Sequence, residues 1–227
     1  MKQEPAGLSN LDMHMRSAKK PSESRPYRKT RRAESEAETR SRIVEATIAL
    51  HESVGPARTT VKAIAERAGV QRATVYNHFP DLEALFEACN AHYYERHPMP
   101  DPAQWASIDP PAKRFSIALD ELYAWYEETE QMLTVGIRDI DAVPPAAREA
   151  FFGYFDQVRD VLVAGRRERG HVRRTATAAI GHAISFVTWR SLVREQSLTR
   201  TEAVSLMAAT VDAAAKAACR SSFPPSW

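Results

Sequence analysis

A run of nine residues, 71–79, combines hydrogen-bonding side chains with a narrow apolar edge. Its polar members supply an arginine fork, two amides, two hydroxyls and an imidazole: Arg72, Gln71, Asn77, Thr74, Tyr76 and His78. Val75 and Phe79 stand four positions apart and would share one face of a helix, which leaves the polar groups on the other faces. A helix that serves only for packing rarely carries so many outward polar groups. The run therefore predicts a helix that contacts another molecule, and its groups match the base edges in the major groove of DNA.

The residues around this run predict the elements that position it. A threonine at 59 or 60 can cap a short helix that ends at Gly69, because glycine suits the left-handed residue that stops a helix. The buried face of that helix would consist of Val61, Ile64, Ala65 and Ala68. Pro80 ends the following helix, since the residue before a proline is pushed out of the helical region. Two short helices joined at Gly69 form a helix-turn-helix.

A longer helix is expected before this pair, over residues 35–53. Ile43, Val44 and Ile48 give it an apolar stripe, acidic residues lie in its first turn, and Gly55-Pro56 ends it. A fourth helix, capped by Asp81, should run to about His97. Prolines then break the chain between residues 98 and 111.

This segment resembles the TetR/AcrR family of one-component transcriptional repressors: from Thr59 to Phe79 it reads T-T-V-x-x-I-A-x-x-A-G-V-x-x-x-T-V-Y-x-H-F. The resemblance covers residues 40–90 and is specific in register, whereas the rest of the chain matches only in length, helicity and position. It implies an all-α fold of about nine helices. An N-terminal three-helix helix-turn-helix DNA-binding domain, residues 34–81, would precede a helical ligand-binding and dimerisation domain, residues 82–227.

The second helix of the motif is expected to read DNA with its N-terminal residues. Arg72 matches guanine, Gln71 or Asn77 can pair with adenine, and the Ala73 methyl can touch thymine. The resemblance further implies phosphate contacts from Thr60, Thr74, Tyr76 and His78, and a backbone or base contact from Lys62.

The N-terminal residues hold the positive charge of the chain. Residues 1–42 contain eleven Lys and Arg against six Asp and Glu, although the whole chain carries a net charge of only +2. Residues 1–33 lack apolar periodicity, which predicts a mobile basic arm. The family pattern usually has a phosphate-binding lysine where this chain has Leu82. The arm could supply the missing contact, or it could be only a solubilising tail.

The C-terminal region is expected to contain helices near 111–131, 133–141, 145–168, 173–195 and 200–219. The last two carry small residues at helical spacing, which predicts a four-helix bundle with a second subunit or, alternatively, packing within one chain: Ala176, Ala179, Gly181, Ala183, Ser185, Val187, Ser191, Ala203, Leu206, Met207, Thr210, Val211 and Ala214. A homodimer would match a palindromic operator in double-stranded DNA.

An effector pocket in this region would be apolar with a few polar groups, and its ligand would be an apolar or aromatic small molecule. Its candidate lining residues are Trp125, Arg138, Asp139, Phe152, Phe155, His182, Phe186 and Trp189. An aromatic residue at helical spacing serves more often as core than as pocket, so both interpretations stand.

Other classes of protein find little support in the sequence. No nucleophile and base pair, phosphate-binding glycine loop or metal-ligand motif is present, so we expect no enzyme activity, no cofactor and no metal. Cys89 and Cys219 are isolated and predict small core residues. No apolar stretch approaches the length of a membrane span, which predicts a cytoplasmic protein without a membrane partner.

The combined prediction is a ligand-responsive homodimeric repressor that binds a palindromic operator. Two alternatives remain open at this stage. One is a helical small-molecule-binding or interaction protein with little affinity for DNA, and the other is an activator on the same fold.

Overall fold

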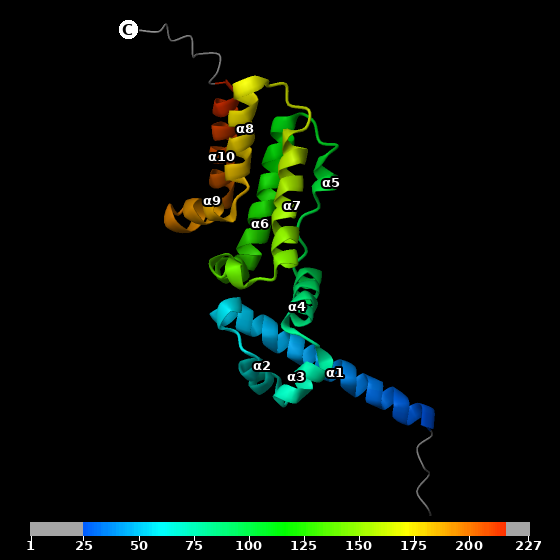
Figure 1. The fold of residues 1–227 in the computed structure, drawn as a ribbon. Helices are drawn as coiled ribbons and strands as arrows, with labels where there is room; N and C mark the ends of the chain where they lie inside the picture. The colour runs from blue at the N-terminus through cyan, green and yellow to red at the C-terminus, as the bar shows by residue number, and fades with distance from the viewer. Residues whose placement is uncertain (1–24, 217–227) are drawn as a thin grey trace, which may run out of the picture. The chain divides into compact units, whose positions relative to one another are not determined.

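The computed structural model describes residues 25–216, and this part of the chain contains α-helices and no strand (Figure 1). The α-helices are α1 (Arg25–Val54), α2 (Val61–Ala68), α3 (Arg72–His78), α4 (Leu82–Arg96), α5 (Pro102–Trp105), α6 (Pro111–Arg138), α7 (Pro145–Val163), α8 (Gly170–Ala183), α9 (Phe186–Arg190) and α10 (Arg200–Lys216). Single turns η1 (Pro56–Arg58) and η2 (Ile140–Ala142) are 3₁₀-helical, and η3 (Ser191–Glu195) is a π-helical turn. The all-α fold class is confirmed.

The chain divides into two compact units, residues 1–39 and residues 40–227. Within the first unit, Arg32 Nε donates to Glu36 Oε1 at 3.0 Å, one turn apart on α1. The predicted start of this helix at residue 35 is wrong, because α1 already begins at Arg25. Residues 25–33, which we assigned to a mobile arm, are thus helical. Their four arginines, together with Lys29 and Ala33, favour a helix without any apolar stripe. Residues 1–24 of the predicted arm lie outside the described part.

Within the second unit, the head comprises residues 40–97, which contain the C-terminal part of α1 together with α2, α3 and α4. Its core contains Ile43, Ile64, Val75, Phe79 and Leu85, each at most 2 % exposed. Cys89 belongs to the same core, as predicted, and its Sγ lies 3.8 Å from Val44 O. Cys219 lies outside the described residues. The side chains of α1, α2, α3 and α4 thus enclose one apolar cluster.

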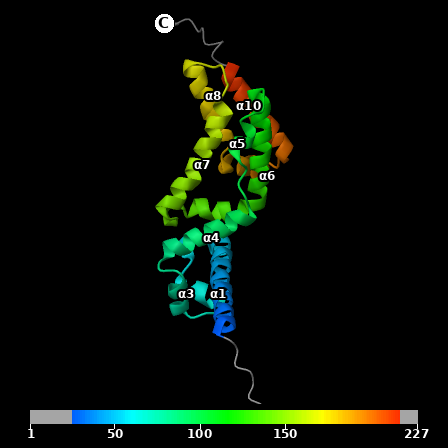
Figure 2. The same cartoon turned by 90° about the vertical axis from the view of Figure 1, so that its right-hand side faces the viewer.

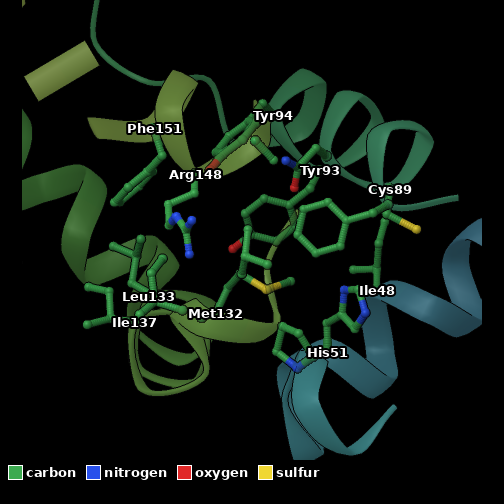
Figure 3. A pocket seen from close by; sticks show the side chains of 17 residues that line it. Ile48, His51, Cys89, Tyr93, Tyr94, Met132, Leu133, Ile137, Arg148 and Phe151 are labelled. Carbon is green, nitrogen blue, oxygen red and sulfur yellow. The ribbon is translucent and has the colours of Figure 1, made fainter. Parts of the chain in front are cut away.

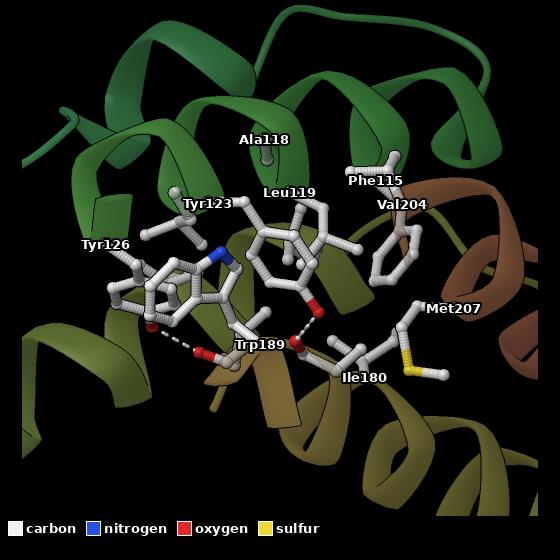
Figure 4. Close-up of a cluster of buried hydrophobic side chains, with 14 of the residues drawn as sticks. Phe115, Ala118, Leu119, Tyr123, Tyr126, Ile180, Trp189, Val204 and Met207 are labelled. Carbon is white, nitrogen blue, oxygen red and sulfur yellow. Dashed lines mark hydrogen bonds between the residues drawn. The ribbon is translucent and has the colours of Figure 1, made fainter. Parts of the chain in front are cut away.

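The body comprises residues 98–216, in which α6 packs against α7 and α10, and α10 packs against α8. Figure 4 shows its core, where aromatic and aliphatic side chains from α6, α8, α9 and α10 meet. Two tyrosines of α6 are buried with satisfied hydroxyls: Tyr123 Oη donates to Ala183 O at 2.9 Å, and Tyr126 Oη donates to Ile184 O. These bonds satisfy carbonyls at the end of α8, where the chain turns into α9.

A buried arginine ties the start of α6 to the end of α7. Arg114 is only 5 % exposed, and its guanidinium donates to the carbonyls of Ile108, Val161 and Ala164 at 2.7–3.1 Å. It also lies 3.6 Å from Asp109. Because the last carbonyls of a helix lack partners within the helix, this cation stabilises the point at which α7 ends.

Several predicted boundaries in the body need correction. A single helix, α6, replaces the two that we expected at 111–131 and 133–141, and within it the Thr129 hydroxyl donates to Trp125 O. The expected loop 98–111 contains the short helix α5, which begins at Pro102 after the Asp101 cap. The helix expected over 173–195 divides at Ile184 and Ser185 into α8 and α9. At the break between α8 and α9, hydroxyls of Tyr123 and Tyr126 on α6 donate to the Ala183 and Ile184 carbonyls, and single-residue preferences do not contain such contacts.

Candidate functional site

The helix-turn-helix has the predicted caps and turn. Thr60 Oγ1 accepts from the amide of Ala63 at 3.2 Å and so caps α2. Gly69 has φ of 66°, the left-handed conformation that glycine tolerates best, and the Val70 amide donates back to Ala65 O at 2.9 Å. This turn sets the angle at which α3 leaves α2.

The inner edge of α3 is anchored in the head as its spacing predicted. Val75 and Phe79 are each 2 % exposed and lie in the core of the head. The guanidinium carbon of Arg40, on α1, lies 4.5 Å from the centroid of the Phe79 ring. A cation over an aromatic face is attracted by its quadrupole, so Arg40 is held beside the end of α3.

The outer surface of α3 carries polar side chains that have no hydrogen-bond or ion-pair partner among the described residues. Gln71, Arg72, Ala73, Tyr76 and Asn77 are exposed, and Tyr76 keeps 55 % of its surface in solvent. Thr74 and His78 are half-buried along the edges of this surface. Within the described part of the chain, none of the polar side chains among these residues makes a hydrogen bond or ion pair, so their groups are available to a partner.

Two further predicted residues lie at the start of α2. Thr60 is exposed, and its hydroxyl oxygen is engaged by the cap while its proton remains free to donate. Lys62 is exposed and lies 3.8 Å from Glu66, a contact too exposed to hold the ammonium firmly. The structure therefore brings all nine predicted DNA contacts together on α3 and the first turn of α2.

The start of α4 carries Leu82 at the position where the family pattern usually has a phosphate-binding lysine. Asp81 caps the helix by accepting from Ala84 N at 2.8 Å, as predicted, and Leu82 follows with 57 % of its surface exposed. An apolar side chain at this place cannot bind phosphate. Arg40 is a nearby cation that sequence reasoning missed, because its position on α1 alone does not show that it stacks on Phe79.

The predicted pocket residues of the body do not surround one cavity. Trp125, Phe186 and Trp189 are at most 5 % exposed and belong to the body core, and Phe155 packs against that core. Phe152 is 51 % exposed and His182 is also exposed. These aromatic residues thus serve mainly as core or surface in this structure. Trp189 Nε1 is buried without a hydrogen-bond partner among the described residues.

Arg138 and Asp139 instead join the end of α6 to the loop after α1. Arg138 Nη2 donates to Val54 O at 2.8 Å, and Asp139 Oδ2 accepts from the amide of Ala57 at 3.2 Å. The two side chains also pair with each other at 2.7 Å, and the hydrogen bond from Arg138 lowers the pKa of Asp139. We call these two residues, with their Val54 and Ala57 partners, the latch.

Gly55 lies between the two ends of the latch. Its φ is 90°, and an added Cβ would collide with Asp139 Oδ2 and Arg138 Nη2. Only glycine allows the latch side chains to approach the loop this closely without strain.

A cavity of about 80 Å³ lies beside the latch, lined by side chains from α1, η1, α4, α6, η2 and α7 (Figure 3). In Figure 2, α4 lies between the C-terminal end of α1 and α6, and it contributes lining residues such as Phe86 and Cys89. Most of the lining is apolar, as the labelled Ile48, Leu133, Ile137 and Phe151 illustrate. None of the eight predicted pocket residues lines this cavity. Its walls come from different segments of the chain, and spacing within one helix does not show which distant segments meet.

The titratable groups of the cavity are shifted toward their neutral forms by burial. Burial lowers the pKa of His51 to about 4 and raises the pKa of Cys89 to about 12. It also raises the pKa of Tyr94 to about 12 and that of Tyr93 further. All four groups are therefore uncharged at neutral pH.

Residues 25–216 contain neither a membrane-spanning helix nor a group of metal ligands. No helix there is both long and apolar enough to cross a bilayer. No cluster of three or more His, Cys, Asp or Glu side chains in residues 25–216 has the arrangement that a metal ion needs.

Solved structures share this fold at low sequence identity. A TetR-like transcriptional regulator from Rhodococcus sp. RHA1 is similar with a TM-score of 0.55 and 14 % identity, over 77 % of this chain and 94 % of that one. NalD, the secondary repressor of the MexAB-OprM multidrug efflux pump in Pseudomonas aeruginosa, has a TM-score of 0.55 and 18 % identity, over 80 % and 97 %. PfmR, a TetR family regulator from Thermus thermophilus, has a TM-score of 0.51 and 17 % identity, over 77 % and 97 %.

The family model for bacterial regulatory proteins of the tetR family matches residues 43–89, which span the end of α1, the helix-turn-helix and the first half of α4. Among curated proteins no sequence matches the chain. The matched segment contains the cap, turn and reading helix described above, and transcriptional regulators of this family are not enzymes, in agreement with the sequence-based prediction. Residues 43–89 thus form a DNA-binding domain of the tetR family of bacterial regulatory proteins, and the described fold is similar to that of solved TetR family transcriptional regulators.

Proposed function

We propose that the protein is a ligand-responsive homodimeric repressor that inserts α3 into the major groove of a palindromic operator. The observation that carries this proposal is the outer surface of α3, where Arg72, Tyr76 and Asn77 are exposed without partners while Val75 and Phe79 hold the helix from behind. A rigid helix with free donors is what base recognition requires. Action on chromosomal DNA would place the protein in the cytoplasm.

The side chains of α3 divide by chemistry into base and phosphate contacts. Arg72 leads the helix and can present its fork to guanine O6 and N7, while Gln71 or Asn77 can pair with adenine and Ala73 can touch a thymine methyl. Thr60, Thr74, Tyr76 and His78 offer single donors suited to phosphate oxygens, and Lys62 can reach the backbone or a base edge.

Arg40 is our candidate for the phosphate contact that Leu82 cannot make. It is exposed, lies at the end of α3, and is fixed by the Phe79 ring at 4.5 Å. The basic residues before α1 remain a second candidate source of phosphate contacts.

The proposed dimer would use the outer sides of α9 and α10. Many of the small residues predicted for this interface pack within the single chain, since Ala176, Ala183 and Ala203 are at most 1 % exposed. Others remain available, because Val187 is 62 % and Leu206 is 45 % exposed. Apolar side chains on a surface are what a second copy would bury, and two-fold symmetry would then match a palindrome.

The proposed effector acts by differential affinity for two arrangements of head and body. The cavity beside the latch suits this role, because its walls come from both regions. The solved NalD structure is described as that of a repressor, which agrees with repression here.

Selection of random double-stranded DNA by the purified protein tests the proposal. Enrichment of a palindromic sequence at moderate salt supports a dimeric DNA reader, and a dimeric mass in light scattering supports the interface. If nothing is enriched, the protein is a helical ligand-binding or interaction protein instead. A reporter placed behind the selected sequence distinguishes repression from activation, because an activator would raise expression from it.

A further inference from the structure

The cavity beside the latch has one lining residue with a permanent charge. Its 17 lining residues contain a single arginine, Arg148 of α7, and no lysine or carboxylate. The remaining titratable groups there are neutral at pH 7, as shown above for His51, Cys89, Tyr93 and Tyr94. The cavity therefore combines apolar walls with one cation.

The guanidinium of Arg148 has no protein partner within the described residues. Figure 3 shows it reaching from α7 toward Leu133 and Ile137 on α6. The residue is half-buried, and its side chain makes no hydrogen bond or ion pair with any residue of the described chain. By contrast, Arg114, Arg138, Arg166 and Arg200 in the same unit all pair with carboxylates. A partly desolvated cation that lacks an anion loses free energy, which an anionic ligand would restore.

We propose that this cavity binds a small organic monocarboxylate, with its carboxylate on the Arg148 guanidinium and its aromatic or short aliphatic body against Phe151, Tyr94, Leu133 and Ile137. An arginine fork and a carboxylate form two parallel hydrogen bonds, which fixes the orientation of the acid. The apolar walls exclude more polar anions such as inorganic phosphate, because those anions would lose hydration without compensation.

The size of the cavity links binding to the head. The cavity is small, at about 80 Å³, and its walls come from both the head and the body, so a bound acid would press on both regions. His51 and Pro56 belong to the head, whereas Gly136, Ile137 and Ile140 belong to the segment that carries the latch. Separation of these walls would strain the Arg138 bond to Val54 O and the Asp139 bond to Ala57 N. This step rests on the ligand-responsive function proposed above, whereas the binding site itself does not.

The test uses the full-length protein with benzoate and hexanoate as probes, and with benzamide and hexanamide as uncharged analogues of the same shape. Binding is measured by calorimetry at millimolar probe. We expect the acids to bind about tenfold or more tightly than the amides, and Arg148→Gln to remove that advantage, because a hydrogen-bonded charge contributes more than a neutral one. Arg159→Gln is the matched control, since Arg159 lies on α7 outside the cavity and pairs with Asp156 at 2.9 Å.

Three results would overturn the inference: no binding of either acid, equal binding of acids and amides, or unchanged acid binding in Arg148→Gln. If Arg148→Gln does not fold, Arg148→Lys keeps the charge without the fork and should bind the acids with intermediate affinity. Operator binding without ligand is measured on the same preparations. If the protein binds an operator but not the acids, only this inference is refuted. If it binds the acids but no operator sequence, only the proposed repressor function is refuted.

Discussion

The outer surface of α3 and the cavity beside the latch are opposite kinds of site. The surface of α3 is contiguous in sequence, polar and exposed, and it lies on one short helix. The cavity is assembled from α1, η1, α4, α6, η2 and α7, is mostly apolar, and holds one charge. A groove in DNA accepts a protruding helix, whereas a small molecule must be enclosed to lose its water. Recognition of DNA therefore needs few contiguous residues, and recognition of a small ligand needs many distant ones.

The two sites also differ in electrostatics. The polar side chains of α3 are exposed or half-buried at the surface of the head. In the cavity, burial keeps His51, Cys89, Tyr93 and Tyr94 neutral, so Arg148 faces little competing charge. A perturbation that acts through burial should therefore affect the cavity and leave α3 largely unchanged.

Acid should test this difference most strongly. His51 has a folded pKa of about 4 against about 6.5 unfolded, so between these values the unfolded state binds the extra proton. The stabilisation from a neutral His51 is complete above about pH 6.5 and is lost as the pH falls toward 4, a change of about 3 kcal/mol. Urea unfolding of the wild type and of His51→Phe between pH 4 and 7 measures this change in the free energy of unfolding.

In His51→Phe this part of the pH dependence should vanish, while packing against the Phe86 ring at 5.4 Å is retained. His171→Gln, at an exposed position on α8, serves as the control and should keep the wild-type profile. Identical profiles for wild type and His51→Phe would contradict the assignment.

Substitutions on α3 should have the next largest effect, and on DNA binding alone. Arg72→Ala should cost about 1–3 kcal/mol of operator binding and relax the preference at one base pair per half-site. Tyr76→Phe should weaken all sequences alike, because a phosphate contact carries no sequence information. Fluorescence anisotropy on operator variants measures both. Equal losses on every sequence from both variants would undo the division into base and phosphate contacts, and benzoate binding serves as the control that should not change.

Gly55→Ala should affect both sites, that is, operator binding by α3 and the response to a ligand in the cavity. A φ of 90° is strained for alanine and the new Cβ would displace the latch side chains, at a cost of about 1 kcal/mol in stability. We expect the operator affinity without ligand to fall toward that of the ligand-bound wild type, and the further effect of the acid to shrink. Gly153→Ala on α7, where nothing lies within 4 Å of the new Cβ, is the matched control. A full ligand response in Gly55→Ala would exclude the latch from signalling.

The smallest effect is expected from the basic residues among positions 1–33, the last nine of which lie in α1. Truncation before residue 34 should weaken operator binding and lower the slope of log affinity against log salt by about 0.9 for each phosphate that is no longer neutralised. Truncation before residue 25 leaves α1 whole and separates the helical basic residues from those that precede them. Arg40→Gln tests the other source of phosphate contacts in the same titration. Unchanged affinity and slope after both truncations would show that these residues act only as a solubilising tail.

Much of the head could be predicted because its signals are local. The Thr60 cap, the left-handed Gly69, the inward Val75 and Phe79 and the Asp81 cap all lie where single residues and their spacing indicate. The early start of α1 at Arg25 was missed, because a charged helix without an apolar stripe resembles an unstructured basic segment. The cation at Arg40 was missed because its stacking on Phe79 joins residues 39 positions apart.

The body could be predicted only as helical. Apolar spacing cannot distinguish a buried aromatic residue from one that lines a cavity, and so Trp125 and Trp189, proposed as pocket walls, lie in the core. Arg138 and Asp139, proposed as polar groups of the pocket, instead bind Val54 O and the amide of Ala57 in the loop after α1. The spacing of small residues on α8 and α10 indicated close packing, and much of that packing occurs within the chain.

The sequence by itself determined the all-α class, the helix-turn-helix and the identity of the residues that face outward from α3. These features depend on capping, turn conformation and helical periodicity, which act over a few neighbouring residues. The tertiary structure alone decided where the cavity lies, which side chains line it, and that Arg148 faces it without a partner among the described residues. Burial, desolvation and ion pairing depend on the distances between segments far apart in the chain, and those distances exist only after the helices have packed.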